Sequence, residues 1–145
     1  MTQGPDQPRD SGELTLVHRR EDVDRAVRTI VTLLERHGYT ESSRFAVRLA
    51  IEEALSNAFR HGHKGLPDGT PVRFAFAADA RELRLTVQDQ GPGFKPDTIP
   101  DPTLDENLEI PSGRGLMLIR AYMTSVEFNE PGNRLTMVYR KPPAK

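Results

Sequence analysis

The segment "EEALSNAFRHG", residues 52–62, places an acid, an amide and an imidazole at helical spacing. Glu53, Asn57 and His61 recur every four residues, so they share one face of a helix. A carboxylate one turn from a carboxamide, at the edge of a cavity, suits proton acceptance and oxygen ligation of a hard cation. The alternative is an ordinary amphipathic helix whose apolar stripe drifts into solvent at its end.

Two glycine-rich segments offer a second kind of chemistry. In "DQGPGF" Asp89 ends a predicted strand, and Gly91 and Gly93 let a ligand approach the backbone closely, although an ordinary turn has the same composition. In "SGRGLMLI" Gly113 and Gly115 precede an apolar helix, where free N–H groups and the positive charge of Arg114 favour phosphate. A flexible hinge capped by Ser112 explains that pattern equally well. Neither segment completes a Rossmann or P-loop motif.

The other polar motifs give no site. His61 and His63 in "HGH" suggest a metal pair, but no third ligand cluster accompanies them, so capping or surface roles are expected. Gly62 is expected to end the helix between them. His18 and His37 lie at the ends of expected elements and receive no role.

The elements that must position these residues follow from hydrophobic periodicity. Strands are predicted over 13–19, 71–78, 82–89, 125–129 and 134–140, and helices over about 21–37, 40–62 and 116–123. A proline-rich, acidic loop separates residue 90 from the last helix, and a loop of that length in a small domain is expected to be a functional lid. Helices grouped before consecutive strands predict an α+β two-layer sandwich, with a mostly antiparallel mixed sheet and helices on one face.

Composition limits the function classes. The 145 residues predict one domain, residues 13–140, between a disordered tail, 1–12, and a short tail, 141–145. Twenty Lys and Arg balance twenty-one Asp and Glu, so no strong field is present to attract nucleic acid or anionic lipid. No signal sequence, membrane span or cysteine is found, and a cytoplasmic location without membrane association is the expectation.

The order of the motifs along the chain resembles that of a known family, although no single motif is specific for it. The chain has four motifs in this order: a helix with Glu and Asn, a strand followed by Asp-x-Gly-x-Gly, a long lid, and Gly-x-Gly before a helix. This order is similar to that in the ATP-binding domain of gyrase, the heat-shock chaperone, histidine kinases and MutL. Within that superfamily, with its histidine-kinase-like ATPase or Bergerat fold, residues 13–140 most resemble the bacterial anti-sigma-factor serine kinases. The expected lid is 95–113, whose acidic sequence matches the family only loosely.

The resemblance implies a role for each matching residue. Glu53 matches the general base, Asn57 the Mg²⁺ ligand that bridges the triphosphate, and Asp89 the acceptor for the adenine amino group. Gly91 and Gly93 would shape the adenine pocket. The lid end that wraps the phosphates corresponds to Gly113, Arg114, Gly115 and Leu116. Glu52 should be turned away, because it lies about 100° around the helix from Glu53.

The resemblance also implies activity and partners. The expected protein is an ATP- and Mg²⁺-dependent serine kinase that phosphorylates an anti-anti-sigma antagonist of STAS type, sequesters a sigma factor and forms a homodimer. A binding module that inhibits its partner without phosphotransfer is the alternative. A detached histidine-kinase domain is a third reading, although the chain lacks room for a phosphoacceptor helix pair.

Overall fold

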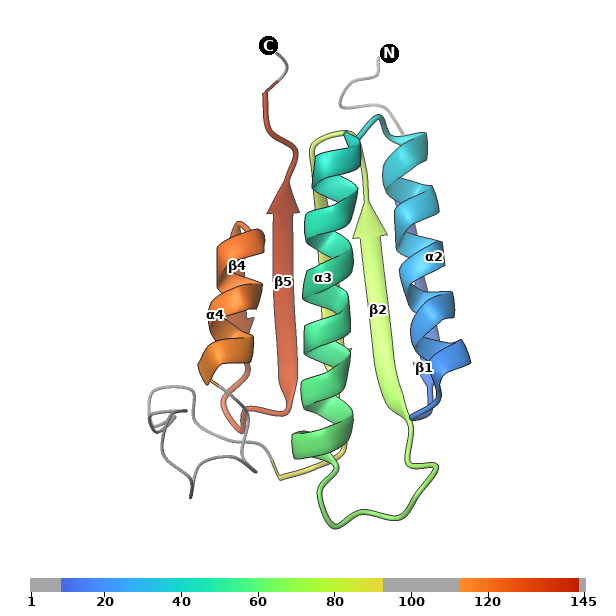
Figure 1. Ribbon diagram of the computed structural model, residues 1–145, viewed down its shortest axis with the longest axis vertical. Coiled ribbons are helices and arrows are strands. Elements are labelled where there is room, and N and C mark those ends of the chain that lie inside the picture. The colour runs from blue at the N-terminus through green and yellow to red at the C-terminus, as the bar shows by residue number, and fades with distance from the viewer. Residues whose placement is uncertain (1–8, 93–112, 144–145) are drawn as a thin grey trace.

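The computed structural model describes residues 9–92 and 113–143 as one sheet with helices packed on one face (Figure 1). The sheet comprises β1 (Asp10–Leu16), β2 (Val72–Ala78), β3 (Glu82–Gln88), β4 (Ser125–Phe128) and β5 (Arg134–Arg140). The strand order is β1-β2-β3-β5-β4, and every paired neighbour is antiparallel. The helices are α2 (Arg20–Arg36), α3 (Glu41–Asn57) and α4 (Gly113–Tyr122), and α3 continues into the π-helical turn η1 (Ala58–Gly62). The predicted α+β sandwich is confirmed.

Local signals fix the ends of the two long helices. Gly38, with φ of 81°, ends α2 in a Schellman arrangement, because its N–H bonds Glu35 O at 3.1 Å and the next N–H bonds Leu34 O at 2.9 Å. Thr40 begins α3, since its Oγ1 accepts the Ser43 N–H at 3.1 Å. Thr40 is therefore the N-cap residue of α3.

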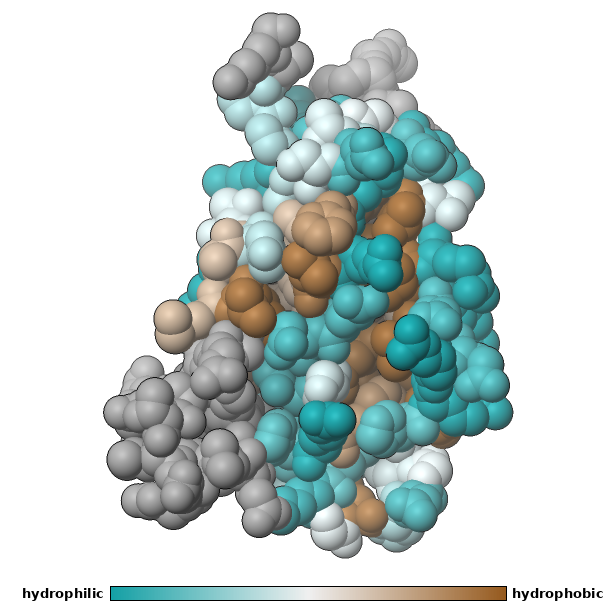
Figure 2. All heavy atoms as spheres, viewed as in Figure 1, coloured by the Kyte–Doolittle hydropathy of each residue, from teal (hydrophilic) through white to brown (hydrophobic). Residues whose placement is uncertain are grey.

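Apolar side chains between the layers form one continuous core. Apolar side chains alternate along β2 and β3: Val72, Phe74, Leu83, Leu85 and Val87 are buried, and Phe76 is partly buried. From the helix side, hydrophilic side chains cover most of the surface, and apolar ones show mainly along the seams between helices (Figure 2). The largest fully buried side chains are Phe74, Leu16, Ile30, Leu34, Ile51, Leu55, Leu83, Leu85, Ile119, Met137, Val47 and Val72.

The ends of the first strand and the last helix differ from the sequence expectation. β1 begins at Asp10 within the expected tail, because residues 10–12 pair with Ala78, Ala77 and Phe76 of β2. β1 ends at Leu16, three residues before the predicted end at residue 19, and α2 begins at Arg20. α4 begins at Gly113, so Gly113–Gly115 belong to the helix and do not precede it. Gly93 and the expected lid up to residue 112 lie outside the described residues, as do residues 1–8 and 144–145.

Candidate functional site

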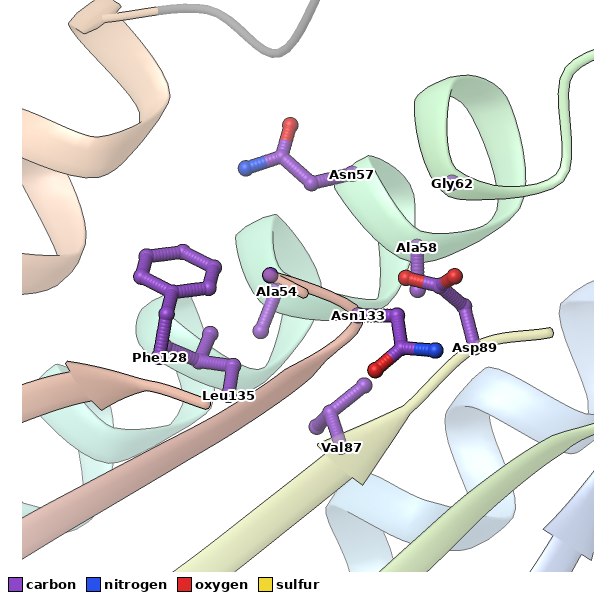
Figure 3. A pocket seen from close by; sticks show the side chains of 10 residues that line it. Ala54, Asn57, Ala58, Gly62, Val87, Asp89, Phe128, Asn133 and Leu135 are labelled. Atoms are coloured by element: carbon purple, nitrogen blue, oxygen red, sulfur yellow. The ribbon is translucent and has the colours of Figure 1, made fainter. Parts of the chain in front are cut away.

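A pocket lies where the end of α3 meets the ends of β3 and β5 (Figure 3). It encloses about 380 Å³ of space, counting the part that is open to solvent. Asn57 and Asp89, which are far apart in the sequence, both line it. The remaining lining residues are Ala54, Ala58, Gly62, Val87, Phe128, Gly132, Asn133 and Leu135. The pocket thus combines an apolar floor with few polar groups, as small-molecule sites generally do.

The helix that carries Asn57 changes its hydrogen-bond pattern at the pocket. Asn57 is the last α-helical residue, and residues 58–62 form the π turn, in which the His63 N–H bonds Ala58 O at 3.0 Å. Single π turns occur often at functional sites. Small side chains at Ala54 and Ala58 leave room between Asn57 and the strand ends (Figure 3). Helical periodicity predicts the helix to residue 62 but does not reveal this wider turn.

Asp89 follows the end of β3 and presents a partly buried carboxylate to the pocket. Its Oδ1 accepts the Gly91 N–H at 2.8 Å, and its own N–H donates to Asn133 O at 2.9 Å. Burial raises the pKa of Asp89 above its ordinary 3.8, although the Gly91 N–H and His63 oppose that rise. The carboxylate is therefore a fixed hydrogen-bond acceptor in a partly desolvated place.

Two glycines let the π turn and the Asp89 turn approach each other backbone to backbone. A Cβ on Gly91 would lie 1.8 Å from Gly62 O, and a Cβ on Gly62 would lie 2.4 Å from Asp89 Cγ. At Gly91 the structure therefore shows the close approach of another backbone, and the approach of a ligand stays a prediction. Gly62 was expected only to end the helix, and its φ is not positive, so its absent side chain matters for space and not for a left-handed cap.

Glu53 lies one turn before Asn57 on α3 and is partly buried, but it is not among the residues that line the pocket. Within residues 9–92 and 113–143, no hydrogen bond or ion pair engages its carboxylate. Glu52 lines a separate groove between α2 and α3, with its Oε2 3.4 Å from Arg48 Nε. The expectation that Glu52 turns away from Asn57 is confirmed.

The glycine-rich start of α4 lies beside the lower half of α3, toward the end where Asn57 is found (Figure 1). Gly113, Arg114 and Gly115 form its first turn, and Leu116 is buried with 3% of its surface exposed. Buried Leu116 packs within the protein and is not among the pocket-lining residues.

Of the capping and surface roles that the sequence predicts for His63, the structure shows the first and not the second. It holds the C-cap position of the π turn, the residue is only 8% exposed, and its ring lies edge-on to Phe59 with the ring centroids 5.9 Å apart. Its Nε2 accepts the Gln90 N–H at 2.9 Å. Burial lowers the pKa of His63, Asp89 partly opposes that effect, and His18 adds to it.

The turn between β4 and β5 contributes residues that sequence reasoning missed. Asn129 Oδ1 accepts the N–H groups of Gly132, Asn133 and Arg134, each at 3.0 Å. Asn133 then reaches Gly91 O through its Nδ2 at 3.2 Å. The composition of "EPGN", residues 130–133, is typical of a turn, but no local signal shows that this turn borders the Asp89 pocket.

The described part of the chain lacks a metal-binding cluster and a membrane-spanning helix. No group of three or more His, Cys, Asp or Glu side chains there is arranged to hold a metal ion. Over the same residues, no helix has both the length and the apolar character that crossing a membrane requires.

Residues 16–139 match the protein family described as the histidine kinase-like ATPase domain. A 30% identical relative over 83 residues is an anti-sigma F factor of Bacillus cytotoxicus, and the match covers 56% of each chain. The serine-protein kinase RsbW of Staphylococcus aureus is 27% identical over 116 residues, which cover 75% of this chain and 73% of that one.

A solved structure has a similar fold. The RsbU and RsbW domains of a Mycobacterium tuberculosis protein superpose with a TM-score of 0.62 at 17% identity, over 94% of this chain and 34% of that one. The present chain therefore spans about half of the first relative and a third of this larger protein.

Proposed function

Since the chain belongs to the histidine kinase-like ATPase domain family, we propose that it binds ATP in the Asp89 pocket and transfers phosphate to a serine. The supporting observation is that Asp89 and Asn57, from separate elements, line one pocket with an apolar floor (Figure 3). In this proposal Asp89 accepts a hydrogen bond from the adenine amino group. Gly91 and Gly93 shape the adenine pocket, and Gly113 to Leu116 complete the phosphate side.

Asn57 is the proposed Mg²⁺ ligand. A single carboxamide oxygen fits an ion that keeps several waters and is held mainly by phosphate oxygens. The lack of a three-residue acidic or histidine cluster among the described residues agrees with such a site. When bound, Mg²⁺ would neutralise part of the triphosphate charge, which is the main electrostatic requirement of phosphoryl transfer.

Glu53 is the proposed base that orients or deprotonates the substrate hydroxyl. Its carboxylate precedes Asn57 by one turn and has no partner within residues 9–92 and 113–143, so it remains available to a substrate. The proposed substrate is an anti-anti-sigma antagonist, and the proposed second partner is a sigma factor. The names of the two curated relatives, an anti-sigma factor and a serine-protein kinase, support these partners.

A partner-binding module without phosphotransfer is the alternative function. One observation favours it: Glu53 lies outside the residues that line the pocket. Both functions need Asn57 and Asp89, but only the kinase needs Glu53.

The test is phosphotransfer from labelled ATP to the antagonist recovered from the native cell by pull-down with and without ATP. Glu53→Gln should reduce transfer at least about 100-fold, the lower range for general base catalysis, and leave ATP binding within about twofold. Glu52→Gln is the matched control, because that neighbouring acid points into the α2–α3 groove. If the wild type transfers no phosphate and Glu53→Gln still sequesters the sigma factor, the result supports the binding module. Label on histidine would support the third reading.

A further inference from the structure

The backbone of the Asp89–Gly91 turn has a partner for every N–H group. Asp89 N–H donates to Asn133 O at 2.9 Å, Gln90 N–H to His63 Nε2 at 2.9 Å, and Gly91 N–H to Asp89 Oδ1 at 2.8 Å. This turn places the carboxylate that is proposed to read the adenine. The groups that fix its backbone therefore also fix the acceptor.

The Gln90–His63 bond differs from the other two because its acceptor titrates. Imidazole Nε2 accepts a hydrogen bond only when it carries no proton, so His63 must be neutral with its proton on Nδ1. Protonation turns Nε2 into a donor that faces another donor. The bond is then lost, and the Gln90 N–H keeps no acceptor in a partly buried turn.

The surroundings of His63 come from three further segments. Asp89 faces it from the end of β3, His18 from the β1–α2 connection, and Asp68 lines the same hollow from the following loop. The ring is packed edge-on against Phe59, which itself is stacked on His18 with centroids 4.9 Å apart. Burial and His18 lower the pKa of His63, and Asp89 raises it by less, so the neutral form prevails at neutral pH.

We propose that His63 is a positioning residue for nucleotide recognition, which holds the Asp89–Gly91 turn in its binding form through the Gln90 amide and releases it when protonated. The proposal rests on the proposed ATP-binding function. His63 touches the turn and not the pocket, because it is absent from the pocket lining. Its effect on binding is transmitted by one hydrogen bond and by the contact of Gly62 with Gly91.

Two substitutions separate the hydrogen bond from simple packing. His63→Gln can place an amide oxygen near the position of Nε2, so it supplies an acceptor that does not titrate. His63→Leu keeps an apolar side chain of similar bulk but supplies no acceptor. At about pH 8 we expect Mg²⁺–ATP affinity near that of the wild type for His63→Gln, and about tenfold lower for His63→Leu.

The pH profile is the decisive measurement. Titration calorimetry with Mg²⁺–ATP between about pH 8 and about pH 5 should show wild-type affinity falling with a step that His63→Gln lacks. The titration of ATP itself cancels in the ratio of the wild-type affinity to the His63→Gln affinity, because both proteins bind the same ligand. Asp89 titrates in both as well. His18→Gln is the matched control, since it removes a second histidine from the same hollow and should keep the step.

A spectroscopic measurement on the nucleotide-free protein tests the hydrogen bond directly. In wild-type protein the Gln90 amide proton should shift with the titration of the His63 ring, and in His63→Gln it should not. A wild-type step that survives in His63→Gln, or a Gln90 amide that ignores the ring titration, overturns the inference. Loss of ATP binding by the wild type at every pH is a different result and overturns the proposed function first.

Discussion

Gly62→Ala is the substitution that tests the geometry of the pocket most directly. The new Cβ would lie 2.4 Å from both Asp89 Cγ and Asp89 Oδ2, whereas ordinary contact begins at 3.4 Å. The carboxylate must therefore move by about 1 Å. It is the end of a side chain and can do so, while alanine gains up to about 1 kcal/mol in helix propensity over glycine. We expect the fold to persist and the acceptor to be misplaced.

The size of the effect follows from the bond that is lost. Hydrogen bonds to a charged group contribute about 1.5–3 kcal/mol, so Mg²⁺–ATP binding should weaken roughly 10- to 150-fold in titration calorimetry. The matched control is Gly65→Ala, three residues away, where no atom lies within 4 Å but φ is 85°. That strain costs about 1–2 kcal/mol and should lower the melting temperature without changing affinity. Wild-type affinity in Gly62→Ala would refute the assignment of Asp89 to the nucleotide.

Two further substitutions separate stability from binding. Phe74→Ala, at a fully buried position on β2, should lower the free energy of unfolding by about 3–5 kcal/mol in denaturant titration, and a loss below about 1 kcal/mol would contradict its place in the core. Asp89→Asn keeps an oxygen for the Gly91 N–H but removes a charge that burial disfavours. Because the folded pKa is raised, the native state holds the proton more tightly than the unfolded chain. Wild-type stability therefore falls as pH rises from 3.8 through the folded pKa. At neutral pH the variant should melt no lower than the wild type and bind Mg²⁺–ATP roughly 10- to 150-fold more weakly, because the same hydrogen bond is lost. A lower melting temperature would show that the charge stabilises the fold.

Local patterns predicted the layers and part of the pocket. The alternation through Phe74 on β2 and Leu85 on β3 reflects one buried face per strand, which is a property of each segment alone. The sequence also indicates that Asp89 and Gly91 follow a strand in a turn, but the approach expected there is that of a ligand, which stays a prediction. The structure places a second backbone against that turn.

The other side of the pocket depended on contacts between distant segments. Gly62 looked like a helix terminator, and the π turn that brings it to Asp89 has no periodic signal of its own. Asn133 looked like a turn residue, and its bond to Gly91 O links positions 42 apart in the chain. The capping or surface role predicted for His63 does not include its bond to the Gln90 N–H, 27 positions away. None of these roles could be read from neighbouring residues.

The two ends of the sheet are built differently, and the difference bears on where the chain can bind a ligand. At the end opposite the pocket, side chains tie the layers together: His37 Nε2 meets Asp10 Oδ2 at 2.8 Å, and Tyr39 donates its hydroxyl to Asp79 O at 2.9 Å. Lys141 also donates to His37 O at 2.9 Å. At the pocket end, one side-chain bond, from the Gln90 N–H to His63 Nε2, joins the layers, and beside it the backbones of Gly62 and Gly91 meet directly.

This contrast explains why the pocket should tolerate fewer substitutions than the opposite end. A side-chain tie can be replaced by another side chain of similar reach, but contact between two backbones admits no added atom without displacement. The space that a ligand needs and the position of its acceptor thus depend on the same two glycines. Fold stability, by contrast, depends on the apolar core between the layers. A substitution at the pocket can therefore abolish ligand binding while the protein stays folded.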